Sequence, residues 1–206
     1  MAYRIGVGGA SYTFMRTLTR LLADLNSDDM ARYLAAKDQL VKRGQMAISA
    51  LINMMLTKTE REGWRAANVL AAMTDVNTTS AFVVALKSRN PLVRQTAAQV
   101  LGEQEDKAVV PNLLDCLNDD NYIVQMWAVE SLGNLGDKRA VESLATLLMQ
   151  TDSPLIQHTT IKALGRIGDT VVAPLLVQFF NSTDPYVPVS AHEVYLELTD
   201  AGEEAH

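Results

Sequence analysis

Apolar residues recur along this chain with two superimposed periods, one helical and one near 31 residues. Within a segment such as 93–101 they are three or four residues apart, which predicts a helix with one apolar face. The longer period is marked by a repeated Leu-Gly pair: Leu101-Gly102, Leu132-Gly133 and Leu164-Gly165. Leu70 and Leu40 continue the register upstream, and Tyr195 continues it downstream. A period of this length predicts stacked supersecondary units.

Residues 90–119 show how one unit is built. Asn90 is suited to cap the free amides of a helix, and Pro91 fits the first turn. The first helix ends near Gly102, and Asp106 is placed to cap a second helix. The same start signal returns at Ser153-Pro154 and Asp184-Pro185. Each unit is therefore predicted to be a helical hairpin.

The register divides the chain into a lead-in and one repeat domain. Residues 1–25 are predicted to hold a lead-in and a helix over 13–25, and residues 26–206 a single elongated all-α domain of about five to six hairpins. The predicted units lie near 28–58, 61–88, 90–119, 121–151 and 153–182, followed by a terminal helix over 185–198. The polar tail 200–206 is predicted to fray.

Equivalent positions in successive units predict the core. A hairpin cannot bury both its faces alone, so Leu101, Leu132 and Leu164 are expected to be buried equivalently between hairpins. A second column holds small residues, which let neighbouring helices approach closely: Ala97, Ala128, Thr160 and Ala191. The last helix has no following hairpin, so His192, in a normally inward column, is expected to be partly exposed.

Composition favours a helical, cytoplasmic protein. Hydrophobic residues make up 48% of the chain but aromatic residues only 6%, as suits helix-on-helix packing. No apolar run approaches the roughly 18 residues of a membrane span, and the start lacks the apolar stretch of a signal peptide. The single cysteine, Cys116, excludes an internal disulfide framework.

The net charge of -6 conceals an asymmetry along the chain. Residues 1–65 hold ten Lys and Arg against six Asp and Glu, whereas residues 66–206 hold eight against 18. Such polarity can orient a partner, and the alternative is a solvated surface with a chance imbalance. The acidic repeat region lacks the basic footprint of nucleic-acid binding, so nucleic acid is not expected as a partner.

The segment Asn90–Gly102 carries a family resemblance. Its order of Val-Arg, then Ala-Ala, then Leu-Gly resembles the HEAT repeats, specifically the short HEAT-like repeats named after phycobilisome lyases. The resemblance is strong over 61–199, weak over 26–60 and absent over 1–25. It implies a right-handed α-α superhelix, or solenoid, that binds other macromolecules. The Arg of the family stands only at Arg94, with Gln125 and Gln157 in its place later, so a ladder of Arg–Asp pairs is not expected.

No catalytic, cofactor or metal site is expected. Gly6-Val7-Gly8-Gly9 lacks the spacing of a nucleotide-binding loop and is predicted to be a flexible lead-in. The three histidines are scattered, and no Cys/His spacing suits zinc. Cys116 is predicted to be a core or groove thiol, since no histidine partner is evident. Asp106 and Asp137 recur with the repeat, which favours capping over catalysis.

One candidate binding surface lies on the first helices. Trp127 occupies a column whose other members are polar: Arg65, Thr96, Thr159 and Ser190. That column is therefore expected to be exposed, and an exposed Trp is typical of an interface. Tyr122 and Met126 adjoin it, so the three residues are predicted to form an apolar, partner-binding patch. The alternative is that Trp127 folds back over a neighbouring repeat.

The second helices form the other candidate surface, because in the resembling family this layer lines the concave face. Its outward row is predicted to consist of Met54, Val84, Asp115, Thr146 and Gln178, with Asn112 and Ser143 nearby. The row runs from apolar to polar along the chain. It offers a graded groove without a reactive constellation.

These features favour a non-catalytic protein–protein interaction module, acting as a scaffold, adaptor or chaperone-like binder. The expected partner is another protein, and self-association is also open. One alternative, implied by the resemblance, is a subunit related to bilin lyases that acts on phycobiliproteins. A more remote alternative is a HEAT-like DNA glycosylase, which requires a basic footprint.

Overall fold

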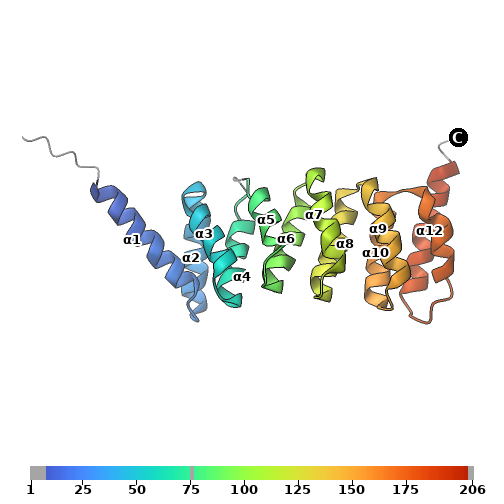
Figure 1. Cartoon of the computed structure of the whole chain (residues 1–206), viewed down its shortest axis with the longest axis horizontal. Helices are drawn as coiled ribbons and strands as arrows, with labels where there is room; N and C mark the ends of the chain where they lie inside the picture. Colours follow the sequence, from blue (N-terminus) through green and yellow to red (C-terminus); the bar gives the residue numbers. More distant parts are fainter. Residues whose placement is uncertain (1–7, 75–76, 204–206) are drawn as a thin grey trace, which may run out of the picture. The chain divides into compact units, whose positions relative to one another are not determined.

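The computed structural model describes the fold of residues 8–74 and 77–203, with side chains from Met15 and from 17–74 and 77–200. Every element in these ranges is helical, and none of them is a strand, which confirms the all-α class (Figure 1). The helices form two compact units, residues 1–81 and 82–206. The division into a lead-in over 1–25 and one domain over 26–206 stays a prediction.

Unit 1 contains α1 (Gly8–Leu25), α2 (Met30–Arg43), α3 (Gln45–Thr57) and α4 (Glu60–Ala71). Helix α1 begins five residues before the predicted start, so a flexible lead-in at Gly8-Gly9 is wrong, while residues 1–7 lie outside the described residues. Once the amphipathic part of α1 has formed, each upstream residue adds a hydrogen bond at little cost. The leucines of its second half are buried or half-buried: Leu18, Leu21, Leu22 and Leu25.

The division between the units falls within α5 (Thr79–Ala85). Unit 2 then contains α6 (Pro91–Glu103), α7 (Val110–Asp115), α8 (Tyr122–Leu135), α9 (Val141–Gln150), α10 (Pro154–Ile167), α11 (Ala173–Leu176) and α12 (Val187–Glu203). The first helices of its repeats, α6, α8, α10 and α12, pack against one another in sequence order. The second helices α7, α9 and α11 form a separate layer.

The second helices of unit 2 are capped at their starts as the sequence predicts. The carboxylates of Asp106, Asp137 and Asp169 accept hydrogen bonds from backbone amides two residues ahead, at 2.9, 2.9 and 3.2 Å. Each cap opens a short 3-10 turn that leads into the α-helix. Helices α7 and α11 are only six and four residues long and end in a further 3-10 turn, which makes this layer more irregular than expected.

The predicted core columns are confirmed. Leu101, Leu132 and Leu164 are fully buried, as are all four members of the small-residue column. The column before it is equally buried and consists of Val93, Val124, Ile156 and Val187. Residues at 31-residue spacing therefore occupy equivalent positions between successive first helices.

The repeated Leu-Gly pair has a steric reason. A Cβ atom on Gly102 would lie 2.6 Å from the backbone Cα of Ser131, and one on Gly133 would lie 2.8 Å from the Cα of Ala163. Neighbouring first helices thus approach so closely that no side chain fits at these positions. Ser131 uses this proximity to donate a hydrogen bond to the carbonyl of Ala98 at 2.8 Å.

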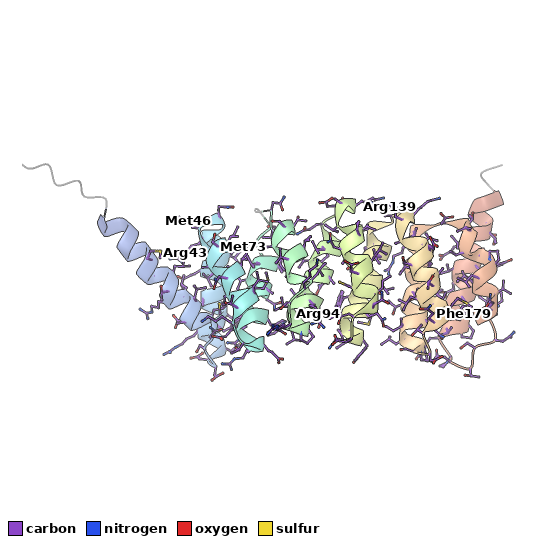
Figure 2. All side chains as sticks on the ribbon, viewed as in Figure 1. Arg43, Met46, Met73, Arg94, Arg139 and Phe179 are labelled. Carbon is purple, nitrogen blue, oxygen red and sulfur yellow. The ribbon has the colours of Figure 1, made fainter. Side chains whose placement is uncertain are left out.

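Polar links join the turns of successive repeats in unit 2. Arg139 donates a hydrogen bond to the carbonyl oxygen of Lys107 at 2.7 Å, and Lys138 forms an ion pair with Asp169 at 3.4 Å. Figure 2 shows Arg139 and Arg94 at opposite ends of the helices of this unit. The turns at one end and the inter-repeat loops at the other are therefore both tied to neighbouring repeats.

The final helix departs from the prediction at both ends. Helix α12 begins at Val187 rather than at 185, although Asp184 accepts the amides of Tyr186 and Val187 at 2.8 and 3.1 Å, as a cap for the predicted start would. The helix continues to Glu203, so a frayed tail from residue 200 is wrong for 200–203, and 204–206 lie outside the described residues. His192 is exposed, as predicted, and stacks on Phe180 with ring centroids 3.7 Å apart.

The two caps at the starts of α6 and α10 are expected to contribute unequally to the free energy of unfolding. Asn90 is buried and accepts the Leu92 amide at 3.0 Å, whereas Ser153 is exposed and accepts the Ile156 amide at 3.5 Å. Asn90→Ala is expected to lower the free energy of unfolding by about 1–2 kcal/mol, and Ser153→Ala by about 0.5 kcal/mol. Urea unfolding followed by circular dichroism measures both. An Asn90→Ala midpoint equal to that of the unaltered protein would contradict the cap.

Candidate functional site

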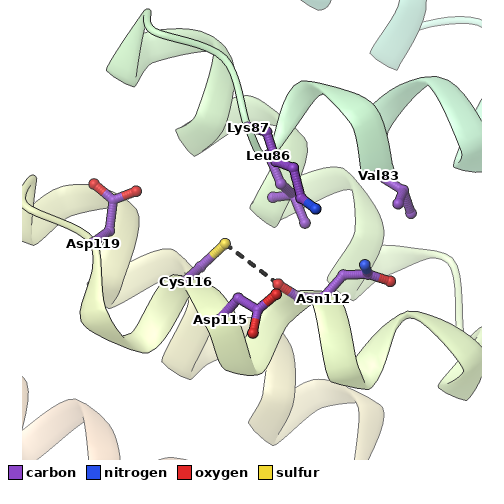
Figure 3. A pocket seen from close by; sticks show the side chains of 7 residues that line it. All are labelled: Val83, Leu86, Lys87, Asn112, Asp115, Cys116 and Asp119. Atoms are coloured by element: carbon purple, nitrogen blue, oxygen red, sulfur yellow. Dashed lines mark hydrogen bonds between the residues drawn. The ribbon is translucent and has the colours of Figure 1, made fainter.

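A small hollow opens in the second-helix layer of unit 2, beside α7 (Figure 3). Its volume is about 90 Å³, and it is lined by Val83, Leu86, Lys87, Asn112, Asp115, Cys116 and Asp119. The end of α5 and the residues after it contribute two apolar side chains and the ammonium group of Lys87, while carboxylates and an amide come from α7 and the turn that follows. One wall of the hollow is therefore apolar except for Lys87, and the other is acidic.

Cys116 lies in this hollow as an inert thiol. It is buried and free, and its Sγ donates a hydrogen bond to the backbone carbonyl of Asn112 at 3.5 Å. Burial, together with the nearby carboxylates of Asp119 and Asp115, raises the pKa of Cys116 to about 11. The thiolate is the nucleophilic form, and at neutral pH this residue is held almost entirely as the thiol. The prediction of a core or groove thiol is confirmed.

Arg94 and Asp119 form a two-pronged ion pair at the edge of the hollow. The Nε and Nη2 atoms of Arg94 lie 2.7 Å from the two carboxylate oxygens of Asp119, and Arg94 also reaches Asp120 at 2.8 Å. Burial disfavours the charge on Asp119, but the hydrogen bonds from Arg94 and from the Asn121 amide hold the pKa of Asp119 below its ordinary value. The bond to Asp119 raises the pKa of Arg94.

The later repeats replace this ion pair by amide contacts, as the sequence indicates. Gln125 donates to the carbonyl of Leu117 at 2.6 Å, and Gln157 donates to the carbonyl of Thr151 at 2.9 Å. All three side chains at this position bond to the segment that links two repeats. Of the three, Arg94 alone makes this contact with a charged side chain, the guanidinium group that pairs with Asp119.

A second, larger hollow lies between α7 and α9. Its volume is about 260 Å³, and it is lined by Leu114, Leu117, Asn118, Glu142, Ser143, Thr146, Leu147 and Gln150. Within the described part of the chain, the carboxylates of Asp115 and Glu142 form no ion pair. The two hollows together are called the second-helix groove here.

The predicted outward row of second helices is largely exposed. Val84, Asp115, Thr146 and Gln178 are exposed, and Asn112 and Ser143 are half-buried in the two hollows. Met54 is the exception: it is buried in unit 1, where its apolar side chain packs into the core instead of facing solvent. Ligand binding by the remaining residues stays a prediction.

The premise of the Trp127 patch is wrong. The column was expected to be exposed because its members are polar, yet Thr96, Thr159 and Ser190 are buried. Their hydroxyls donate to backbone carbonyls four residues earlier, at 2.9, 2.8 and 3.1 Å, so burial leaves no unpaired donor. Trp127 and Met126 are half-buried, and only Tyr122 is exposed. A partner-binding role for these three residues stays a prediction.

A different apolar row on the same helices was missed. Leu92, Ile123, Leu155 and Tyr186 occupy one column in the first turns of α6, α8, α10 and α12. Leu92, Leu155 and Tyr186 are 40%, 49% and 70% exposed, and Ile123 is half-buried. The sequence did carry the signal, an apolar column at repeat spacing, but no surface was predicted from it. These four residues are called the first-helix stripe here.

The described residues contain no group of three or more His, Cys, Asp or Glu side chains placed to hold a metal ion. Among the helices that the structure describes, none is long and apolar enough to cross a membrane. The geometry of unit 2 thus offers two surfaces, a polar groove on the second helices and an apolar stripe on the first helices.

The chain matches the family model of HEAT repeats over residues 48–131, 79–152 and 110–194. These matches cover more than half of the chain, which therefore belongs to the HEAT repeat family of helical hairpin proteins. The resemblance inferred from the Leu-Gly register is confirmed.

Comparison with known proteins places enzymes and binding proteins among the similar chains. The chain is 25% identical over 179 residues to deoxyhypusine hydroxylase-B of Oryza sativa subsp. japonica, covering 85% of this chain and 49% of the relative. It thus spans about half the length of that relative. The complex of CpcE and CpcF of phycocyanin lyase from Nostoc is 24% identical, with a TM-score of 0.54, over 89% of this chain and 65% of that one.

A designed protein shares the fold more completely. A computationally designed armadillo repeat protein for modular peptide recognition has a TM-score of 0.60 at 16% identity, and covers 88% of this chain and 99% of its own. At such low identity these structures show the fold alone. They support an all-α solenoid of stacked repeats.

Proposed function

We propose that this chain is a non-catalytic protein-interaction module, a scaffold, adaptor or chaperone-like binder, whose second-helix groove holds an extended, basic segment of another protein. The observation that carries the proposal is the set of unpartnered polar side chains in that groove. Asp115 and Glu142 form no ion pair with any described residue, so their charge is available to a cationic ligand.

The amide side chains of the groove suit a peptide main chain. For Asn112, Asn118 and Gln150, no side-chain hydrogen bond to another described residue is formed. An amide side chain both donates and accepts, so it can pair with the backbone N–H and C=O groups of an extended peptide. The designed armadillo protein for modular peptide recognition shares the fold on which this groove lies.

The test uses a labelled peptide of alternating Lys and Val, about ten residues or roughly 33 Å long when extended. Its acidic counterpart, with Glu in place of Lys, is the specificity control. Fluorescence anisotropy with the full chain is expected to show binding of the Lys peptide that weakens as salt is added. The acidic peptide is expected not to bind.

Two charge-removing variants locate the site. Asp115→Asn and Glu142→Gln are each expected to weaken binding about two- to five-fold, the range for an exposed ion pair. Glu197→Gln, an exposed change on α12 outside the groove, removes the same charge and is the matched control. If the control weakens binding as much as the groove variants, attraction is non-specific and the groove is not the site.

A lyase-related role is the second candidate, because the complex of phycocyanin lyase subunits shares this fold over 89% of the chain. It predicts that the chain changes the covalent attachment of a bilin to a phycobiliprotein. Zinc-enhanced fluorescence of the phycobiliprotein after denaturing electrophoresis, with and without this chain, distinguishes that activity from simple binding.

A further inference from the structure

The first-helix stripe is an apolar row in unit 2 that is exposed at three of its four positions. Its four residues come from four successive first helices that pack side by side. Outer side chains of neighbouring helices make contact here: the rings of His158 and Tyr186 meet edge to face, with centroids 6.5 Å apart. Two further exposed apolar residues adjoin the stripe, Tyr122 and Val189. A row of this extent is typical of an interaction surface rather than of scattered surface residues.

Most backbone groups under the stripe that the structure describes already form hydrogen bonds within their own helices. The amides of Leu92, Ile123 and Tyr186 are bonded to the cap side chains of Asn90, Asn121 and Asp184, at 3.0, 3.0 and 2.8 Å. The carbonyls of Leu92, Leu155 and Tyr186 accept hydroxyls of the following turn. An extended peptide would find few main-chain partners along this row. A helix, which satisfies its own backbone, would need none.

The spacing of the stripe is close to two turns of a helix laid across it. Packed helices lie about 8–10 Å apart, and seven residues of an α-helix rise about 10.5 Å, slightly above the upper end of that range. Apolar residues at seven-residue intervals on a crossing helix would therefore meet successive members of the stripe. Four such anchors require a helix of about 22 residues.

The charge beside the stripe indicates which charge the partner helix would carry next to its apolar residues. Asp120 and Asp152 are exposed in the loops between the repeats, and Asp152 forms no ion pair with any described residue. Residues 82–206 hold eight Lys and Arg against 17 Asp and Glu. The exposed Arg89, close to Leu92 in the sequence, adds a positive charge at that end of the stripe. A helix with basic flanks therefore complements the stripe best over α8 and α10.

We propose that the first-helix stripe of unit 2 binds a basic amphipathic helix of another protein, with apolar residues repeating every seven positions. This partner differs from the extended segment proposed for the second-helix groove, and it binds a different layer of the repeats. With one ligand on each layer of helices, the chain would act as an adaptor that joins two protein segments.

The test uses a synthetic peptide of about 22 residues with Leu at four heptad positions and Ala and Lys elsewhere. A second peptide has the same composition, but its Leu residues are scattered around the helix. Fluorescence anisotropy with the full chain is expected to show saturable binding of the first peptide and at least tenfold weaker binding of the second. Equal binding of the two would overturn the proposal.

Stripe variants then locate the site. Leu155→Ser combined with Tyr186→Ser is expected to weaken binding at least tenfold, and Asp152→Lys several-fold with a smaller dependence on salt. Val171→Ser is the matched control, because Val171 is 69% exposed but lies on the second-helix layer. Circular dichroism confirms that each variant folds. Unchanged binding by the double variant would overturn the proposal.

Two further measurements distinguish this proposal from binding in the second-helix groove and from self-association. Asp115→Asn and Glu142→Gln are expected to leave binding of the amphipathic peptide unchanged, so failure of one surface does not imply failure of the other. Sedimentation of the protein alone tests whether the stripe meets a second copy instead. A dimer that Tyr186→Ser dissociates would overturn the proposal in favour of self-association.

Discussion

Replacing Leu132 by alanine is expected to lower the free energy of unfolding by about 2–5 kcal/mol. Leu132 is fully buried in α8, and α8 packs against both α6 and α10. Truncation therefore removes apolar contacts on two sides and leaves a cavity that the closely spaced first helices cannot easily fill. Urea unfolding monitored by circular dichroism measures the loss.

The same variant tests how strongly the repeats depend on one another. In a stacked array each repeat is stabilised mainly by its neighbours, so weakening the middle one uncouples those on either side. A broadened transition, with a lower dependence on urea, is the expected sign. Leu155→Ala is the control, because its side chain is about half exposed and its loss is expected to cost little. A Leu132→Ala midpoint equal to that of the control would show that the column is not core.

The fold was predictable because the same residue types recur where the same contacts recur. Leu101 and its equivalents are buried between hairpins, and the glycine that follows each is required by the approach of the next helix. Such constraints act on every repeat and so appear as a period in the sequence. Element ends do not recur from repeat to repeat in this way. The start of α1 at Gly8 and the extension of α12 to Glu203 were therefore missed.

The binding surfaces were predicted less well, because polarity and exposure are not equivalent. Thr96 and Thr159 are polar but buried, since each hydroxyl bonds to a carbonyl of its own helix. Leu92 and Leu155 are apolar and repeat-spaced but exposed, since they lie off the helix face that buries the adjacent Val93 and Ile156. A column in the sequence shows that positions are equivalent. It does not show which way they face.

Recurrence also distinguishes the acidic residues that cap helices from those whose carboxylates have no partner among the described residues. Asp106, Asp137 and Asp169 stand at one position in three repeats, and all three cap a helix. Asp115 and Glu142 have no such equivalents among the caps and no ion-pair partner in the described chain. Among the acids outside the cap positions, Asp119 is paired with Arg94, whereas Asp115 and Glu142 form no ion pair with any described residue.

Replacing Asp119 by asparagine is expected to destabilise unit 2 by about 3 kcal/mol at neutral pH. The side chains of Arg94 and Asp119 are only 11% and 9% exposed and share two hydrogen bonds of 2.7 Å. Removing the carboxylate leaves a largely buried guanidinium with Asp120 as its only remaining charged partner among the described residues. Asp152→Asn, which removes an exposed and unpaired carboxylate, is the control and is expected to change stability little.

The pH dependence gives this prediction a second, independent readout. Because the pKa of Asp119 is lowered in the folded protein, the unfolded chain binds its proton more readily. The ion pair therefore contributes fully above the unfolded value of about 3.9, and its contribution is lost as the pH falls through the folded value. The unaltered protein is expected to lose stability over that acid range more steeply than Asp119→Asn does.

The difference between the two curves of stability against pH isolates Asp119. Asp137, whose pKa the hydrogen bonds from Arg139 lower to about 2, is retained in both proteins and affects both curves equally. Parallel curves would show that Asp119 has no lowered pKa and that the ion pair does not stabilise the fold.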